Sequence, residues 1–178
     1  MSVLRMTTGC ACWSMLGVWL SASACGGHAA PEAVDAGPPP FVATQSDFAG
    51  FAAWESFDGG SQAMDGLNVV GQRTLYLNRR PPHGSIQFPT GTMVVKTTAG
   101  APTLAMAKRG GDFNATGALG WEWFQLASAT DGDVQIVWRG EGAPVMFTYS
   151  TGGTCNSCHF SAYFNDFVEG SPLALSQF

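Results

Sequence analysis

The residues with the most specific chemistry are Cys155, Cys158 and His159, which form a C-x-x-C-H run near the C-terminus. This run is the attachment signature of c-type haem. Its spacing has a chemical reason, because two thiols so placed can each add to a vinyl group of one porphyrin while the adjoining imidazole reaches the iron. A histidine ligand makes such an iron a haem centre. The motif predicts covalently attached haem c, anchored by Cys155 and Cys158, with His159 as the axial ligand of the iron.

Two other uses of a cysteine pair stay open. In an exported protein the pair can form a disulfide, and in a zinc ribbon it can supply half of a four-ligand metal site. Neither use accounts for the histidine directly after the second cysteine. A zinc ribbon needs a second ligand pair, and after Cys25 the chain offers only His28 and His83 besides the motif itself. The main alternative to haem is therefore a small β-rich lipoprotein with a Cys155–Cys158 disulfide.

Export is predicted from residues 1–24, which have the layout of a secretory signal peptide. They carry Arg5, an apolar run that ends at Leu20, and small residues directly before Cys25. The run is too short to span a bilayer as a mature helix. A cysteine after a small-residue cleavage site resembles a bacterial lipobox, although Ala22 stands where such boxes usually carry leucine. We expect a periplasmic or membrane-anchored protein, with lipid on Cys25; ordinary cleavage nearby is the alternative.

Composition limits both the fold and the partners. The 178 residues include 23 glycines, 12% are charged and 12% are aromatic, which favours turn-rich β structure over long solvated helices. The net charge is −5, and without Arg5 only 7 basic residues face 13 acidic ones. Because nucleic acid and anionic membrane surfaces attract clustered Lys and Arg, neither is expected as a direct partner.

The exported part divides into a tether and one domain. Residues 25–44 are rich in Pro, Gly and Ala and lack a hydrophobic period, which predicts a flexible tether. The domain is expected at 45–178 and opens with a predicted amphipathic helix. Ser46 is its expected N-cap, apolar residues follow at helical spacing, and residues 58–60 end it.

The rest of the domain alternates with period two and predicts an antiparallel sheet or open barrel. In the segment 119–127, Trp121 and Trp123 fall on one face while Glu122 and Phe124 fall on the other, so this strand is expected to be central and covered on both sides. A short haem-binding helix and loop are expected at about 151–168. The fold class is mainly β (α+β), with strands predicted at 67–78, 92–98, 103–108, 119–127, 134–139 and 145–149.

Four sequence blocks follow one another in a recognisable order. They are FPTGTMVVK (88–96), MAKRGG (106–111), GWEWF (120–124) and CNSCH (155–159) with NDFV (165–168) after it. In these blocks the chain resembles the cytochrome P-460 family of exported c-type haem proteins, which includes β-sheet cytochromes c-prime, and the resemblance extends from about residue 67 to the C-terminus. It implies a mostly antiparallel β fold, a homodimer, and a haem with an open distal face that takes a small nitrogen ligand, hydroxylamine or nitric oxide.

The same resemblance assigns further site residues. In the enzymes of this family a lysine is joined covalently to the porphyrin edge, and the matching residue here is Lys96. Its strand parity with Thr92 and Val94 agrees with an inward side chain, while a solvated lysine at a sheet edge is the alternative. Oxidation of hydroxylamine also needs a proton acceptor near the iron. Glu122 and Asp112 are candidates by position, and both can equally be surface residues.

Two classes of function follow from this site. One is an oxidoreductase that oxidises hydroxylamine or nitric oxide and passes electrons to an unidentified partner. The other is a non-catalytic haem protein that binds nitric oxide or transfers electrons. Electron transfer favours a methionine as sixth ligand, for which Met93, Met106 and Met146 are available. Each of these methionines also suits a core position in a strand, and His83 lies in a turn where an exposed side chain is expected.

Overall fold

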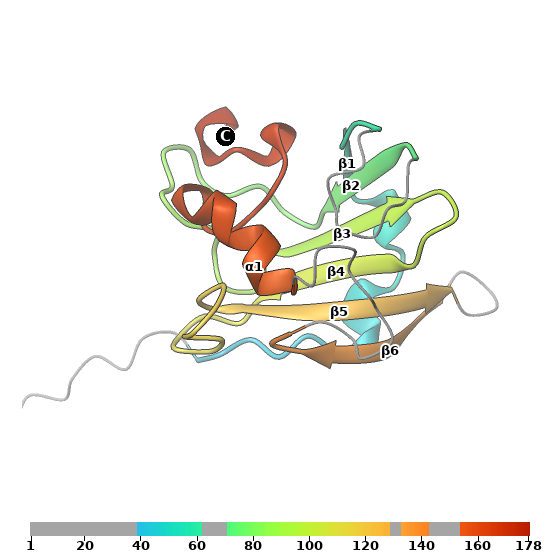
Figure 1. Ribbon diagram of the computed structural model, residues 1–178, viewed down its shortest axis with the longest axis horizontal. Helices are drawn as coiled ribbons and strands as arrows, with labels where there is room; N and C mark the ends of the chain where they lie inside the picture. Colours follow the sequence, from blue (N-terminus) through green and yellow to red (C-terminus); the bar gives the residue numbers. More distant parts are fainter. Residues whose placement is uncertain (1–38, 62–70, 129–132, 143–153) are drawn as a thin grey trace, which may run out of the picture. The chain divides into compact units, whose positions relative to one another are not determined.

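The domain is a six-stranded antiparallel sheet in which the strands lie in their order along the chain (Figure 1). This arrangement is seen in a computed structural model that describes residues 39–61, 71–128, 133–142 and 154–178. Each strand pairs antiparallel with the next, which confirms the predicted antiparallel sheet. The strands are β1 (Glu55–Asp58), β2 (Arg73–Leu77), β3 (Met93–Thr98), β4 (Thr103–Lys108), β5 (Trp121–Ser128) and β6 (Val134–Gly140).

Most strand predictions agree with the structure to within a residue or two. β3, β4 and β6 nearly reproduce the predicted segments, while β5 begins at Trp121 rather than at 119 because Gly120, with φ of 80°, turns the chain there. β2 covers the end of the segment predicted at 67–78. The strand predicted at 145–149, the predicted signal peptide with Cys25 and most of the predicted tether lie outside the described residues.

The predicted N-terminal helix is replaced by two 3₁₀ helices and a strand. η1 (Gln45–Phe48) is capped by Thr44, whose Oγ1 and backbone N–H donate to Asp47 Oδ2 over 2.6 and 2.7 Å. Gly50, with φ of 68°, ends this turn before η2 (Phe51–Ala53). The residues that complete the helical pattern instead form β1, because pairing with β2 satisfies their backbone groups.

The tether is also shorter than its composition predicts. Ala43 is fully buried, its carbonyl accepts from Arg139 Nη1 over 2.9 Å, and the Phe41 N–H donates to the Arg109 carbonyl over 3.0 Å. A Pro-rich stretch therefore enters the packed domain several residues before 45.

The sheet is covered on both faces by different parts of the chain (Figure 1). One face packs against the C-terminal region, including Val168 and Leu173. The other face packs against the N-terminal segment, including Ala43 and Phe48. We call these the C-terminal face and the N-terminal face. β5 contributes to both, as its alternation predicts, with Trp121 and Trp123 on the C-terminal face and Phe124 and Leu126 on the N-terminal face.

A bulge in β6 changes which side chains face each way. Leu126 pairs with Ile136 and Gln125 with Trp138, so Val137 is the extra residue in β6. An extra residue reverses the alternation of the strand beyond it. As a result Ile136 packs on the N-terminal face, whereas Trp138 packs against the cluster on the C-terminal face.

The C-terminal region consists of short helical turns. After α1 (Cys155–His159) the chain continues as the 3₁₀ helices η4 (Phe160–Asn165), η5 (Ser171–Leu173) and η6 (Leu175–Gln177). The predicted helix and loop around the haem motif thus corresponds to a single α-turn followed by 3₁₀ turns. In the part of the chain that is described, no helix has the length and apolar character needed to cross a membrane.

Candidate haem site

The C-x-x-C-H motif forms α1, one short helix that presents its chemical groups to one side. Positions i, i+3 and i+4 of a helix share a face, so Cys155, Cys158 and His159 point in similar directions. Thr154 caps this helix, since its Oγ1 accepts from the Ser157 N–H over 3.2 Å and its own N–H donates to Ser157 Oγ over 2.7 Å. Cys155 is half-buried and Cys158 is exposed.

A cavity of about 250 Å³ brings the motif together with the sheet. Both cysteines and His159 line it, and the C-terminal face contributes most of the remaining side chains. Its lining is mainly apolar, with a few charged groups among them. Among the lining residues, the strands contribute Arg73 of β2, Lys96 of β3, Met106 of β4, Trp123 of β5 and Trp138 of β6.

His159 is held in one tautomer and one orientation. Its Nδ1 lies 2.7 Å from the Phe167 carbonyl oxygen. A carbonyl oxygen can only accept, so Nδ1 carries the proton and Nε2 keeps the lone pair that a metal ion binds. The Trp123 ring lies against the imidazole, with ring centroids 4.5 Å apart and planes inclined by 50°.

The pKa of His159 is lowered, chiefly because burial disfavours the charged imidazolium. The hydrogen bond to the Phe167 carbonyl and the charge of Glu169 act in the opposite direction, and the positive charge of Lys96 lowers the pKa further. A lowered pKa keeps the imidazole neutral, which is the form that ligates a metal ion.

Asn156, inside the motif, joins α1 to the sheet. Its Oδ1 accepts from Trp123 Nε1 over 2.9 Å and from Asn114 Nδ2 over 2.8 Å, and its Nδ2 donates to Asn114 Oδ1 over 2.9 Å and to the Glu141 carbonyl over 2.8 Å. Gly117 lies so close that a Cβ there would overlap the Asn156 amide. The position of α1 therefore depends on contacts with residues far away in the sequence.

Lys96 lines the same cavity as the C-x-x-C-H motif. It is half-buried in β3, opposite Leu75 of β2 and Leu104 of β4, and its charge acts on His159. Its side chain shares a sheet face with Val94, which belongs to the cluster under α1. This is the inward direction that strand parity allows, and it differs from that of a solvated edge lysine.

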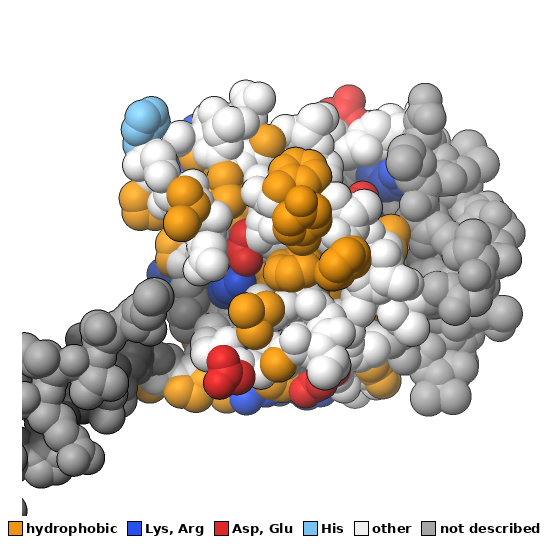
Figure 2. Space-filling model, turned by 60° about the vertical axis from the view of Figure 1, so that its left-hand side comes forward, with side chains coloured by type: hydrophobic (Ala, Val, Ile, Leu, Met, Phe, Trp, Pro, Cys, Tyr) orange, Lys and Arg blue, Asp and Glu red, His pale blue; other side chains and the backbone are white. Residues whose placement is uncertain are grey.

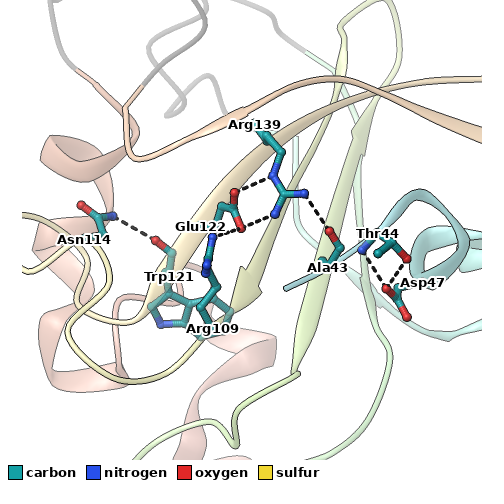
Figure 3. Close-up of polar contacts among 8 residues, drawn as sticks. All are labelled: Ala43, Thr44, Asp47, Arg109, Asn114, Trp121, Glu122 and Arg139. Carbon is teal, nitrogen blue, oxygen red and sulfur yellow. Dashed lines mark hydrogen bonds and ion pairs between the residues drawn. The ribbon is translucent and has the colours of Figure 1, made fainter. Parts of the chain in front are cut away.

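Glu122 points to the N-terminal face of the sheet, where it lies with Arg139 and Ala43 (Figure 3), and it is not among the residues that line the cavity. Arg139 holds its carboxylate in two hydrogen bonds, Nε to Oε1 and Nη2 to Oε2, each 2.7 Å long, and Arg109 Nη1 lies 3.3 Å from Oε2. The pairing also raises the pKa of Arg139 above its ordinary value. Asp112 is exposed in the turn between β4 and β5. Neither carboxylate lines the cavity, so neither is placed to accept a proton there.

The carboxylate that does line the cavity is Glu169, which sequence reasoning did not single out. Arg73 and Trp138 were also missed. Arg73 and Lys96 are both on the C-terminal face, as strand alternation with Leu75 and Val94 implies once the register is known. Trp138 reaches the cavity only because of the bulge at Val137.

The predicted candidates for a sixth ligand of the iron differ in whether they line the cavity. Met106 lines the cavity with His159, whereas Met93 is buried in the cluster on the N-terminal face. His83 is exposed in a turn, as expected, and is not among the lining residues. Met146 lies outside the described residues.

The face that carries α1 and η4 also exposes large apolar side chains, and Figure 2 shows hydrophobic side chains gathered on it. Ile86, Phe160, Tyr163 and Phe164 are 61% to 86% exposed. Apolar groups gathered in this way are commonly covered by a partner.

Within the described ranges, no group of three or more His, Cys, Asp and Glu side chains is arranged to hold a metal ion by itself. Comparison of the chain with protein-family models, with curated proteins and with solved structures finds no match.

Proposed function

We propose that this protein is an exported c-type haem protein that binds a small nitrogen ligand, hydroxylamine or nitric oxide, at the iron. One observation carries the proposal: both motif cysteines line one cavity with a histidine whose Nδ1 donates to a carbonyl, which leaves the lone pair of Nε2 to bind a metal ion. A bare disulfide needs no such histidine.

The residues around the cavity suit a haem. Two thiols and one imidazole are the donor set of c-type attachment. The Phe167 carbonyl strengthens the imidazole as a ligand, as second-shell acceptors generally do. The cationic Arg73 and Lys96 are complementary to the carboxylates at a porphyrin edge, for which a guanidinium is well shaped. Apolar groups such as Trp138 shield the remaining surface from water.

Each residue then has a role that its chemistry supports. Cys155 and Cys158 would hold the porphyrin through two thioether bonds; each would form by addition of S–H across a vinyl group, with the hydrogen ending on carbon, so no oxidant would be needed. His159 would supply the nitrogen ligand of the iron, and Trp123 and the Phe167 carbonyl fix its ring. When bound, the iron supplies a site for the nitrogen ligand and for electron exchange.

The first experiment is to express the chain with a c-haem maturation system and to record its absorption spectrum and intact mass. We expect a haem band and a mass increase that survives denaturation. Replacing both cysteines with alanine should abolish both, and His159→Ala should leave the haem attached but change its spectrum. Wild-type protein without haem, and with two fewer thiols than the reduced chain, would instead favour the disulfide.

The proposed cross-link from Lys96 has its own test. Lys96→Arg keeps the positive charge but cannot form the same bond, and Lys96→Ala removes both. If the cross-link exists, the two variants change the ferrous spectrum alike and peptides from β3 lose the haem mass. If Lys96 acts only through its charge, Lys96→Arg resembles the wild type.

A substitution of Glu169, the carboxylate that lines the cavity, can distinguish catalysis from ligand binding. Oxidation of hydroxylamine releases protons, and Glu169 is the acidic side chain among the lining residues. We expect steady-state oxidation with an artificial electron acceptor, and a large loss of turnover in Glu169→Gln with little change in nitric oxide affinity. Binding of nitric oxide without turnover in the wild type would support the non-catalytic form of the proposal.

Electron transfer is the second candidate, because Met106 shares the cavity with His159. A methionine sixth ligand gives a low-spin, six-coordinate spectrum, and Met106→Ala would convert it to an open-site spectrum. An open-site spectrum in the wild type would exclude this candidate.

Sedimentation tests the expected homodimer, and the mass of the mature N-terminus tests both export and lipid on Cys25.

A further inference from the structure

A buried ion pair, Lys108–Asp166, lies next to the turn that contacts His159. Lys108 Nζ is 2.6 Å from Asp166 Oδ1, and the two side chains are only 8% and 4% exposed. Lys108 also donates to the Leu119 carbonyl over 3.1 Å and lies 5.1 Å from the centre of the Trp121 ring. Charges removed from water in this way are costly unless they are paired and hydrogen-bonded, so the pair fixes the position of Asp166 strongly.

Asp166 is fastened by its backbone as well as by its side chain. Its Oδ2 accepts from the Phe88 N–H over 2.9 Å, and its carbonyl accepts from Trp121 Nε1 over 2.7 Å. Three parts of the chain that are distant in sequence therefore converge on this one residue.

These contacts hold a strained turn. Asp166 and Phe167 have φ of 51° and 64°, so two consecutive residues other than glycine are left-handed. Such a conformation costs free energy and persists only where surrounding contacts impose it. The turn directs the Phe167 carbonyl onto His159 Nδ1, 2.7 Å away.

From this chain of contacts we propose that Asp166, neutralised by Lys108, is a positioning residue for His159: it holds the turn whose carbonyl fixes the tautomer and orientation of the imidazole. The inference rests on the proposed function only where it concerns the iron. With haem attached, the same contact sets how strongly His159 donates to the metal.

The test uses double variants, so that no buried charge is left without its partner. Lys108→Met/Asp166→Ala removes the ion pair and the side-chain oxygen that accepts from the Phe88 N–H. It also puts alanine, which tolerates a left-handed backbone less well than aspartate, at position 166. Lys108→Met/Asp166→Asn removes the charges but keeps an oxygen acceptor and a residue that tolerates this conformation. Glu122→Gln/Arg139→Met is the matched control, because it removes an ion pair with a buried carboxylate on the opposite face of the sheet.

Nitrogen-15 NMR reports the Nδ1 proton of His159 in the chain produced without haem and in the diamagnetic carbon monoxide complex of the loaded protein. We expect its exchange with solvent to be about tenfold faster in the alanine double variant, intermediate in the asparagine variant and unchanged in the control. In loaded protein the reduction potential should rise in the same order, because a less firmly bonded imidazole donates less to the iron.

Equal exchange and equal potentials in the wild type and both variants would overturn the inference. If the alanine variant does not fold, the asparagine variant decides alone: faster exchange supports the inference and wild-type exchange overturns it. A wild type that takes up no haem contradicts the proposed function, while the exchange rates still test the role of Asp166.

Discussion

The two faces of the sheet use similar groups for different purposes. Each has a core of aromatic and aliphatic side chains, and each has a buried carboxylate paired with a base. On the N-terminal face the Glu122–Arg139 pair fastens the N-terminal segment through the Ala43 carbonyl. On the C-terminal face the Lys108–Asp166 pair fastens a turn that contacts His159.

The two faces differ in how completely the segments that cover them fill the space over the sheet. The N-terminal segment packs buried side chains such as Phe48 against the sheet, whereas α1 and the turns after it leave a cavity lined by the motif and the sheet. Stability is thus shared between both faces, but the proposed chemistry belongs to one. Variants matched across the sheet separate the two contributions.

The largest effects are expected from aromatic residues in the two cores. Trp123→Ala on the C-terminal face and Phe48→Ala on the N-terminal face should each lower the free energy of unfolding by about 3–5 kcal/mol, since Trp123 and Phe48 are 3% and 0% exposed. Chemical denaturation measures both losses. Only Trp123→Ala should also alter the haem spectrum, because Trp123 contacts His159; an equal spectral change in Phe48→Ala would contradict the division between the faces.

Breaking the ion pair on the N-terminal face should have a smaller effect. Arg139→Met leaves the carboxylate of Glu122 buried, with Arg109 as its nearest base, and should cost about 1–3 kcal/mol. Denaturation is again the measurement. The haem spectrum should stay as in the wild type, and a shift in it would show that the Glu122–Arg139 pair affects the cavity on the opposite face.

A glycine pair tests how α1 is attached. Gly117→Ala forces a methyl group against the Asn156 amide and should cost about 1–3 kcal/mol through overpacking. It should also lower the yield of attached haem, because Asn156 joins the motif to Trp123. Gly142→Ala is the control, since a Cβ there meets nothing within 4 Å. Equal haem yields in both variants would mean that the position of α1 does not depend on this contact.

The smallest effect is expected at the surface, where Arg80 bonds Glu55 in β1. The hydrogen bond from Arg80 lowers the pKa of Glu55 below its ordinary 4.5. A lowered carboxylate pKa adds stability above the ordinary value, and this is lost as the pH falls through the lowered one. The difference in Tm between the wild type and Glu55→Gln should be slight at neutral pH and vanish in acid. If the Tm difference between the wild type and Glu55→Gln grew as the pH fell, the lowered pKa of Glu55 would be contradicted.

Much of the sheet was predictable because period-two alternation is a local property. The strands β3 to β6 follow from it nearly residue by residue, and so does the two-faced character of β5. The N-terminal helix prediction was wrong, because pairing with β2 outweighs the helical spacing of a few aromatic residues. The motif residues Cys155, Cys158 and His159 were found from sequence, but Arg73, Trp138 and Glu169 were missed because no local pattern places them at the cavity.

The sequence by itself determined the C-x-x-C-H motif, the alternation of the strands and the shared parity of Lys96 and Val94, since all three depend on spacing along a single segment. It did not determine on which face of the sheet Lys96 lies. Only the tertiary structure decided which carboxylate reaches the cavity, because alternation puts Glu122 and Trp123 on opposite faces without saying which face packs against the motif. It also decided the reversal of β6 at Val137 and the left-handed turn at Asp166 and Phe167. Those features are imposed by pairing and burial between distant segments, which no local period records.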